Sequence, residues 1–263
     1  GIFRSIGIAL NQIYTPKSAP KDFSQCELEE DVSQGDISVN ARSCDFAEVV
    51  RKTAESRVCV AIDFSRQAPG EYLFQVSSTV NVNGLPTLLD QFAREAGFTL
   101  RVDFDATVLS SSHVLMEDTG LVLGRALKEI LVLRMEAFGV NAAGSSLATT
   151  DDFRNQPIRA GISVEGRKFV KIVPFEGTSD ALKQRFIIGQ NVCNSLFSED
   201  LDDFLDGLAG GLGCSIMIHI KEQTDPDEGW QMIFKNMGNA LKGVFGLNPY
   251  RKGVPPGIKA TLV

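Results

Sequence analysis

The sequence predicts an α+β fold made of two similar halves, and repeated segments are the main reason. LGRALKEI (residues 123–130) is similar to MGNALKGV (residues 237–244) at an offset of 114 residues, and LDQF (89–92) is similar to LDDF (201–204) at an offset of 112. Repeats at a fixed spacing indicate a duplicated structural unit. Each copy falls in a predicted strand–strand–helix–strand–helix order, which favours helices packed on mainly antiparallel sheets.

The first half is predicted over residues 51–140. In ESRVCVAIDF, alternating apolar residues predict a half-buried strand, and EYLFQVSSTVNV predicts the next strand after the turn residues QAPG. LPTLLDQFAREA predicts a helix that ends at Gly97. FTLRVDF and SSSHVLM then predict strands. An amphipathic helix follows with Glu117 and Asp118 in its first turn, where exposed backbone N–H groups favour negative charge.

The second half is predicted over residues 158–263. Two strands are predicted first, in IRAGISV and KFVKIVPF. A helix is predicted in SEDLDDFLDGLAGGLG, a further strand in CSIMIHI, and a closing helix over residues 229–246. The Gly-, Ser-, Thr- and Asp-rich residues 141–157 predict a surface linker between the halves.

Residues 1–50 differ from the rest and predict an N-terminal arm outside the repeat. Pro- and Ser-containing TPKSAPKDFSQ precedes the acidic ELEEDVSQGD, and the arm's first residues are apolar. Because such residues need cover, we expect the arm to reach another protein subunit or a peripheral membrane surface. Gly1 and Ser5 fit a myristoylation pattern, and a trimmed N-terminus is the alternative.

Composition excludes several classes. The formal net charge of −7 argues against nucleic-acid binding, which needs a basic surface. No apolar run is long enough to span a membrane. The five cysteines lack CxxC spacing and predict thiols in a reducing compartment, cytoplasmic or the interior of a plastid or mitochondrion. Two histidines are too few for a zinc site of the usual kind.

Several segments, kept in order over residues 51–263, resemble the imidazoleglycerol-phosphate dehydratase family of histidine biosynthesis. RKTAESRVCVAIDF resembles its opening strand, and HVLMEDTGLVLGRALKEIL resembles its HHxxEDTxxxLGxAL signature. VEGR is similar to its LSGR turn, IHI with MIFKNMGNALK to its LHxxxG…HHxxEAxFKAxARAL region, and PPGIKATL to its PSTKGxL.

The resemblance implies a duplicated fold of the ribosomal S5 domain 2-like type, with trimers assembled into 24-subunit shells. It also implies two manganese ions held by imidazoles and carboxylates. Matching positions give His113, Glu117 and His219 as metal ligands, and Glu117 and Asp118 as catalytic acids. Arg167 and Lys259 match basic residues that bind the substrate's phosphate, a contact that charge-assisted hydrogen bonds make well.

The chain departs from the family where that chemistry needs ligands. Positions that carry family ligands or their neighbours hold Thr87, Val114, Asp227, Glu228 and Gln231. Neutral imidazole is the natural donor to such a metal, whereas the remaining carboxylates suit harder cations. We therefore expect the two or three surviving ligands to hold no pair of manganese ions tightly.

The surviving residues each have a second interpretation. His113 and Glu117 are either a metal pair or a hydrogen-bonded histidine beside a helix-capping acid. His219, in an apolar strand, is a ligand or a core histidine. Arg167 binds phosphate or is ion-paired within its turn, and Lys259 binds phosphate or lies on the surface. Trp230 is expected to fill what was a polar cavity in the family.

The sequence thus predicts a non-catalytic structural or assembly subunit of a larger complex, without a cofactor, that associates with itself or with other subunits. The alternative is an active or repurposed metal-dependent hydro-lyase acting on a phosphorylated small molecule, with manganese as cofactor. A binding module with an anion pocket at Arg167 and Lys259 is the third hypothesis.

Overall fold

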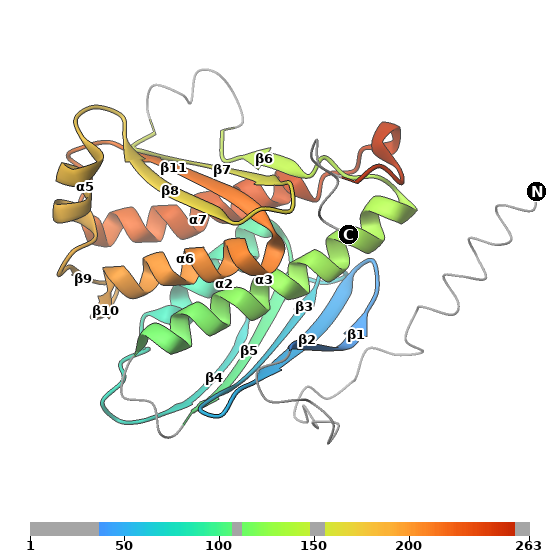
Figure 1. Ribbon diagram of the computed structural model, residues 1–263, viewed down its shortest axis with the longest axis horizontal. Coiled ribbons are helices and arrows are strands. Elements are labelled where there is room, and N and C mark those ends of the chain that lie inside the picture. Colours follow the sequence, from blue (N-terminus) through green and yellow to red (C-terminus); the bar gives the residue numbers. More distant parts are fainter. Residues whose placement is uncertain (1–36, 107–111, 148–155, 256–263) are drawn as a thin grey trace, which may run out of the picture.

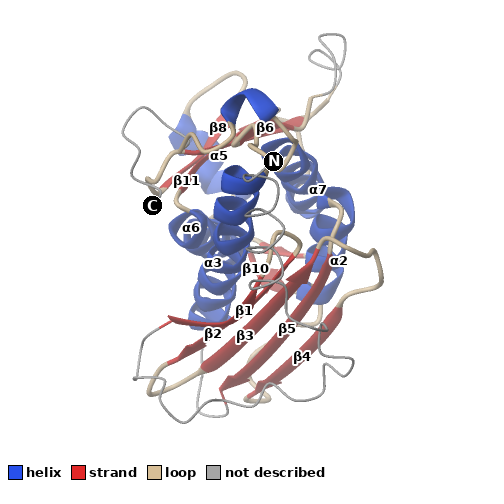
Figure 2. Ribbon diagram, turned by 90° about the vertical axis from the view of Figure 1, so that its right-hand side faces the viewer, coloured by secondary structure: helices blue, strands red, loops and turns tan. Residues whose placement is uncertain are grey.

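The computed structural model describes residues 37–106, 112–147 and 156–255, which form two large β-sheets with a layer of helices between them, and a third sheet of only two short strands (Figures 1 and 2). This arrangement confirms the predicted α+β class. None of the described helices is long and apolar enough to cross a lipid bilayer.

The first sheet has five strands in the order β1-β2-β3-β5-β4. Neighbours are antiparallel except β4 and β5, which are parallel. The elements of this half are β1 (Ile37–Arg42), β2 (Phe46–Lys52), β3 (Arg57–Asp63), β4 (Glu71–Val76), α2 (Leu85–Ala96), β5 (Thr99–Ala106) and α3 (Ser112–Ala137).

The second sheet has four strands in the order β6-β7-β11-β8, and only β8 and β11 are parallel. This order repeats β2-β3-β5-β4 of the first sheet, so the duplication is confirmed. The elements of this half are β6 (Ala143–Ser145), β7 (Ile158–Val164), β8 (Phe169–Pro174), α5 (Ser179–Phe186), β9 (Asn191–Val192), β10 (Leu196–Phe197), α6 (Ser198–Leu212), β11 (Cys214–Ile220), α7 (Pro226–Val244) and the 3-10 helix η1 (Pro249–Arg251).

Three predicted boundaries need correction. Residues 37–50, assigned to the arm, form β1 and most of β2, because Ile37 and Val39 pack against the core of the first sheet. Within the predicted linker, residues 143–145 form edge strand β6 and pair with β7. Helix α3 begins at Ser112, so the segment predicted to end a strand is its first turn. Residues 1–36 and 148–155 lie outside the described residues.

The helices pack across the two halves rather than within them. α3 of the first half lies on α6 of the second, and α7 of the second lies on α2 of the first (Figure 2). On α3, Gly120 lies against the backbone of Phe204 and Gly124 against that of Leu208. Because both contacts advance together along the chains, α3 and α6 run parallel and their N-termini meet.

Glycine is required at this helix contact because backbone touches backbone. A Cβ atom at Gly124 would lie 2.4 Å from the carbonyl oxygen of Leu208, and one at Gly211 would lie 2.0 Å from that of Leu121. Neither oxygen can move away without displacing a helix. The interhelical spacing therefore depends on these missing side chains.

The cysteines differ in state. Cys44, Cys193 and Cys214 are free thiols, and burial raises the pKa of Cys193 and of Cys214 to about 12. Cys59 is disulfide-bonded. The prediction of thiols throughout is therefore wrong at Cys59.

We predict that Gly211→Ala destabilises the protein by about 1–3 kcal/mol, since overpacking forces α3 and α6 apart. The neighbouring Gly210→Ala is the matched control, because a Cβ there meets only the side chains of Lys168 and Leu121, at 3.4 Å or more. A helical alanine at this position should be neutral or stabilising by about 0.5–1 kcal/mol. Urea denaturation of both variants is the measurement, and equal midpoints would contradict the close contact.

Candidate functional site

The meeting N-termini of α3 and α6 place a histidine among acidic groups. Asp203 Oδ2, on α6, lies 2.6 Å from His113 Nδ1, and Glu117 Oε2, one turn along α3, lies 3.6 Å from His113 Nε2. Ser112 Oγ donates a hydrogen bond to Asp200 on α6. The imidazole is half exposed, so the cluster lies at the surface.

Electrostatics couples these groups. The hydrogen bond to Asp203 raises the pKa of His113 above its ordinary value of 6.5, and the charges of Asp203, Glu117 and Asp200 act in the same direction. Burial is the main cause that raises the pKa of Asp200, and it raises that of Asp202 to about 6. The site thus favours a protonated imidazolium against a neighbouring carboxylate.

The N-termini of α2 and α7 form the equivalent place in the other half, without an imidazole. Asp227 follows His113 by 114 residues, and Gln231 follows Glu117 by the same number. Gln231 Nε2 donates to Asp227 Oδ2 at 2.8 Å, and the backbone N–H of Cys193 donates to Asp227 Oδ1 at 2.5 Å. Asp227 therefore has protein partners that hold it in place.

The resemblance also points to Thr87, Val114 and Glu228 as positions of metal ligands or their neighbours, and these three side chains do not form a group of possible metal ligands. Thr87 is exposed on the first turn of α2, Glu228 is exposed on α7, and Val114 packs against the core. Trp230 is fully buried, stacks on Phe186 at 5.7 Å between ring centroids, and donates its indole N–H to Ser198. Its bulk occupies the interior beside the start of α7.

Asp118 anchors the fold. Its carboxylate is buried, accepts a hydrogen bond from Ser56 Oγ at 3.0 Å and forms an ion pair with Arg51 of β2. These contacts join α3 to β2 and to the turn before β3. Asp118 faces away from Glu117, since adjacent residues of a helix do not share a face.

The structure does not bring His219 to His113. His219 lies on β11, alternating with residues that face the helices, so it belongs to the outer face of the second sheet. Phe175 lies 5.7 Å from its ring, and Arg159 stacks over Phe175 at 4.1 Å. Burial, followed by the Arg159 charge, lowers the His219 pKa. It is therefore not a histidine of the core.

Of the two candidate phosphate contacts, Arg167 lies within the described residues. Arg167 is exposed in the turn between β7 and β8, where its guanidinium donates to Glu165 at 2.9 Å. Glu165 also accepts from Ser215 Oγ at 2.8 Å, so the turn holds the pair in place. Lys259 lies outside the described residues.

Sequence reasoning missed the acidic partners of His113. Asp200 and Asp203 come from SEDLDDF, which was identified only as a helix and as the repeat of LDQF. The repeat itself carried the signal. At the offset of 112, Asp203 stands where the first copy has Gln91. This difference places a carboxylate beside His113.

Fold and site together define a class of protein. It is a duplicated α+β chain in which each half contributes one helix to each helix pair, and a group of polar side chains, called a half-site below, lies where the two helices of each pair begin. The sequence profile of the imidazoleglycerol-phosphate dehydratases matches residues 80–241, more than half of the chain. The chain belongs to that family.

Curated relatives and solved structures agree with this assignment. The imidazoleglycerol-phosphate dehydratase of Streptococcus sanguinis is 26% identical over 208 residues, covering 79% of this chain and 95% of the relative. That of Xanthobacter autotrophicus is 22% identical over 216 residues, or 82% and 98%. Among solved structures, the Staphylococcus aureus enzyme gives a TM-score of 0.54 at 15% identity, covering 77% of this chain and 99% of that one. The Pyrococcus furiosus enzyme in complex with (S)-C348 gives 0.50 at 20% identity, or 80% and 99%.

The residues present do not fit two imidazole-rich manganese ions. His113, Asp200 and Asp203 can each offer one atom within 4.8 Å of the others, which suits at most one ion. Asp203 Oδ2 already bonds His113 Nδ1, and Ser112 Oγ bonds Asp200 Oδ2. The second half-site has Asp227 and Gln231 bonded to each other and no histidine. Among the described residues of this chain, no complete ligand set for two ions is brought together, and metal catalysis depends on fixed, complete coordination.

The histidines provide a direct test of the cluster at α3. We expect two imidazole titrations by NMR, with His113 above 6.5 and His219 below it. Asp203→Asn should lower the His113 pKa and leave that of His219 unchanged. Because the folded-state pKa of His113 is raised, its stabilising contribution is complete below the unfolded value and is lost as pH rises through the folded value. Two unchanged titrations in Asp203→Asn would contradict the assigned contact.

Asp118 and Glu117 allow a comparison of adjacent acids. We predict that Asp118→Asn destabilises the protein by about 1–3 kcal/mol, since it leaves Arg51 without its charge partner. Glu117→Gln, exposed and one residue away, should stay within about 0.5 kcal/mol of the wild type. Thermal or urea unfolding checks both, and equal effects would mean that Asp118 is not the anchor.

Proposed function

We propose that this member of the imidazoleglycerol-phosphate dehydratase family does not catalyse the dehydration and serves as a structural or assembly subunit of a larger complex. The main observation in support is that the two histidines lie in different parts of the structure. His113 is bonded to Asp203 at the start of α3, while His219 lies on the outer face of the second sheet with Phe175. Neither is joined by a second imidazole, since the chain has two in all.

The fold supports the structural role independently of the site. The chain keeps both large sheets, the two helix pairs that join the halves and the glycine contacts between those helices. The fold is therefore intact although few possible metal ligands are present. Self-association is the partner relation that family membership favours. Association with other subunits is the wider proposal.

One observation favours the alternative, a repurposed metal-dependent hydro-lyase on a phosphorylated small molecule. His113, Asp200 and Asp203 form the one group of three donors in the described residues that are close enough to hold an ion. Glu117, half exposed 3.6 Å from His113, would be a fourth donor. Arg167 is exposed, yet it is ion-paired within its own turn and gives this alternative little support.

The test is an assay of the purified full chain with manganese and imidazoleglycerol phosphate. We expect no imidazole-acetol phosphate above background, because removal of even outer partners of a metal ligand costs roughly 10–100-fold in affinity or activity. A family enzyme with its complete histidine set is the positive control. Manganese-dependent turnover that is lost in His113→Ala and in Asp203→Asn would overturn the proposal and establish the alternative.

A further inference from the structure

A short hairpin of the second half reaches the second half-site, which lies at the starts of α2 and α7. Strands β9 and β10 lie at the end of the molecule where α6 and α7 begin, and residues 193–195, called the hairpin tip below, join them (Figure 1). In the first half, the corresponding connection from β4 to α2, residues 77–84, contains neither helix nor strand. The hairpin is therefore an addition to the duplicated unit that only the second half carries.

Contacts with the starts of both helices hold the hairpin tip in place. The backbone N–H of Cys193 donates to Asp227 Oδ1, at the start of α7, at 2.5 Å. Asn81 Nδ2, in the chain just before α2, donates to the carbonyl oxygen of Asn194 at 2.8 Å. Gly84, the N-cap of α2, has no room for a Cβ atom, because it would overlap the carbonyl oxygen of Cys193. The tip thus lies where a ligand of this half-site would have to bind.

The backbone of the hairpin tip is strained. Cys193, Asn194 and Ser195 have φ angles of 49°, 64° and 68°, and they are three of the four non-glycine residues with positive φ in the described chain. Residues other than glycine rarely adopt this conformation, although asparagine tolerates it better than most. Such strain persists only where surrounding contacts impose it, and it is typical of ligand clamps and switch segments. The contacts of the tip with Asn81 and Asp227 impose it here.

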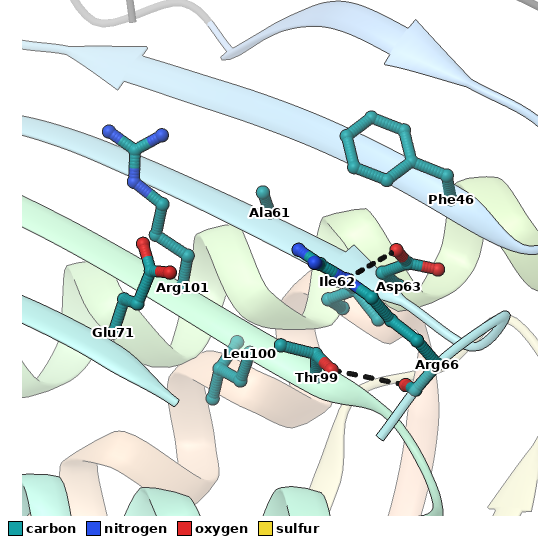
Figure 3. A pocket seen from close by; sticks show the side chains of 9 residues that line it. All are labelled: Phe46, Ala61, Ile62, Asp63, Arg66, Glu71, Thr99, Leu100 and Arg101. Atoms are coloured by element: carbon teal, nitrogen blue, oxygen red, sulfur yellow. Dashed lines mark hydrogen bonds and ion pairs between the residues drawn. The ribbon is translucent and has the colours of Figure 1, made fainter. Parts of the chain in front are cut away.

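The pocket in Figure 3 makes no comparable contact with a half-site. It lies on the outer face of the first sheet, where Arg66 forms an ion pair with Asp63 and its carbonyl oxygen accepts a hydrogen bond from Thr99 Oγ1. None of the residues that line this pocket belongs to the start of a helix. The hairpin tip is therefore the feature that controls access to the second half-site.

We propose that the hairpin tip is a latch, which closes the second half-site from within the chain and opens while the rest of the fold stays intact. In the closed form, the N–H of Cys193 occupies the carboxylate oxygen of Asp227 that a ligand would need. Opening releases the backbone strain and makes the start of α7 accessible. Local opening of this kind costs less free energy than global unfolding. The latch rests on the contacts of the tip alone, so it does not depend on whether the chain is an enzyme.

Two free thiols report opening and unfolding separately. Cys193 is 8% exposed, and burial, followed by the charge of Asp227, raises its pKa to about 12. Because the thiolate is the reactive form, the closed tip protects this cysteine from alkylation. Cys214, on β11, is 0% exposed within the core. In the intact full chain without denaturant, we expect iodoacetamide to alkylate Cys193 at least about tenfold faster than Cys214, because local opening precedes global unfolding.

Substitutions test the latch in both directions, with peptide mapping to assign the label to each cysteine. Asn81→Ala removes the clamp on the tip and should speed the alkylation of Cys193 several-fold. Ser195→Gly relieves the closed form, since glycine adopts positive φ readily, and should slow it. Asn83→Ala, at an exposed position two residues from the clamp, is the matched control and should leave the rate unchanged.

Several results would overturn the latch. Equal alkylation rates at Cys193 and Cys214 would mean that the tip opens only when the whole protein unfolds. A Cys193 rate that Asn81→Ala leaves unchanged would show that the clamp does not hold the tip, and a Cys214 rate that rises with it would show loss of the whole fold. If Asn81→Ala does not fold, Ser195→Gly decides, and an unchanged or faster Cys193 rate in that variant would contradict the proposal.

Discussion

The contact of α3 with α6 sets the geometry on which the rest of the structure depends. Two helices from different halves approach until backbone meets backbone at Gly124 and Gly211. α7 makes the related contact with α2, where a Cβ at Gly238 would lie 2.4 Å from the carbonyl oxygen of Phe92. Because each pair joins the halves, neither half completes its helix layer alone. The two sheets are therefore held as one body.

The same contact creates the places where chemistry would occur. Parallel packing brings the first turns of α3 and α6 together, so His113 meets Asp203 although 90 residues separate them. In the other half, Asp227 meets Cys193 and Gln231. The polar side chains at these two pairs of helix starts are carboxylates, an amide and a single imidazole. Hydrogen bonds within the protein now satisfy groups that a metal centre would need free.

Much of the fold could be predicted because its signals are local or repeated. Helix α2 and strand β11 have the predicted bounds, since Gly97 ends the one and strict alternation defines the other. The start of α3 was misjudged because residues 112–116 have strand-like composition, and only packing against α6 makes them helical. β6 was missed because it has only three residues, and β1, which has six, was missed because the change in composition assigned its residues to the arm.

The site was predictable only in part for the same reason. The loss of imidazoles was read from residue types, and His113 and Glu117 are neighbours on α3 as their spacing indicated. Asp200 and Asp203 could not be placed beside them, because that contact depends on the crossing of helices from different halves. The separation of His219 likewise depends on which face of β11 it occupies.

Manganese binding tests the central claim most directly. The full chain would be equilibrated with micromolar manganese, freed of unbound ions by gel filtration and analysed for metal content, with Asp203→Asn and a family enzyme in parallel. An intact fold without the family's two-ion centre predicts less than one manganese ion per chain. Two tightly held ions per chain would contradict the account, because they would require a complete ligand set that His113 and its acidic neighbours do not provide.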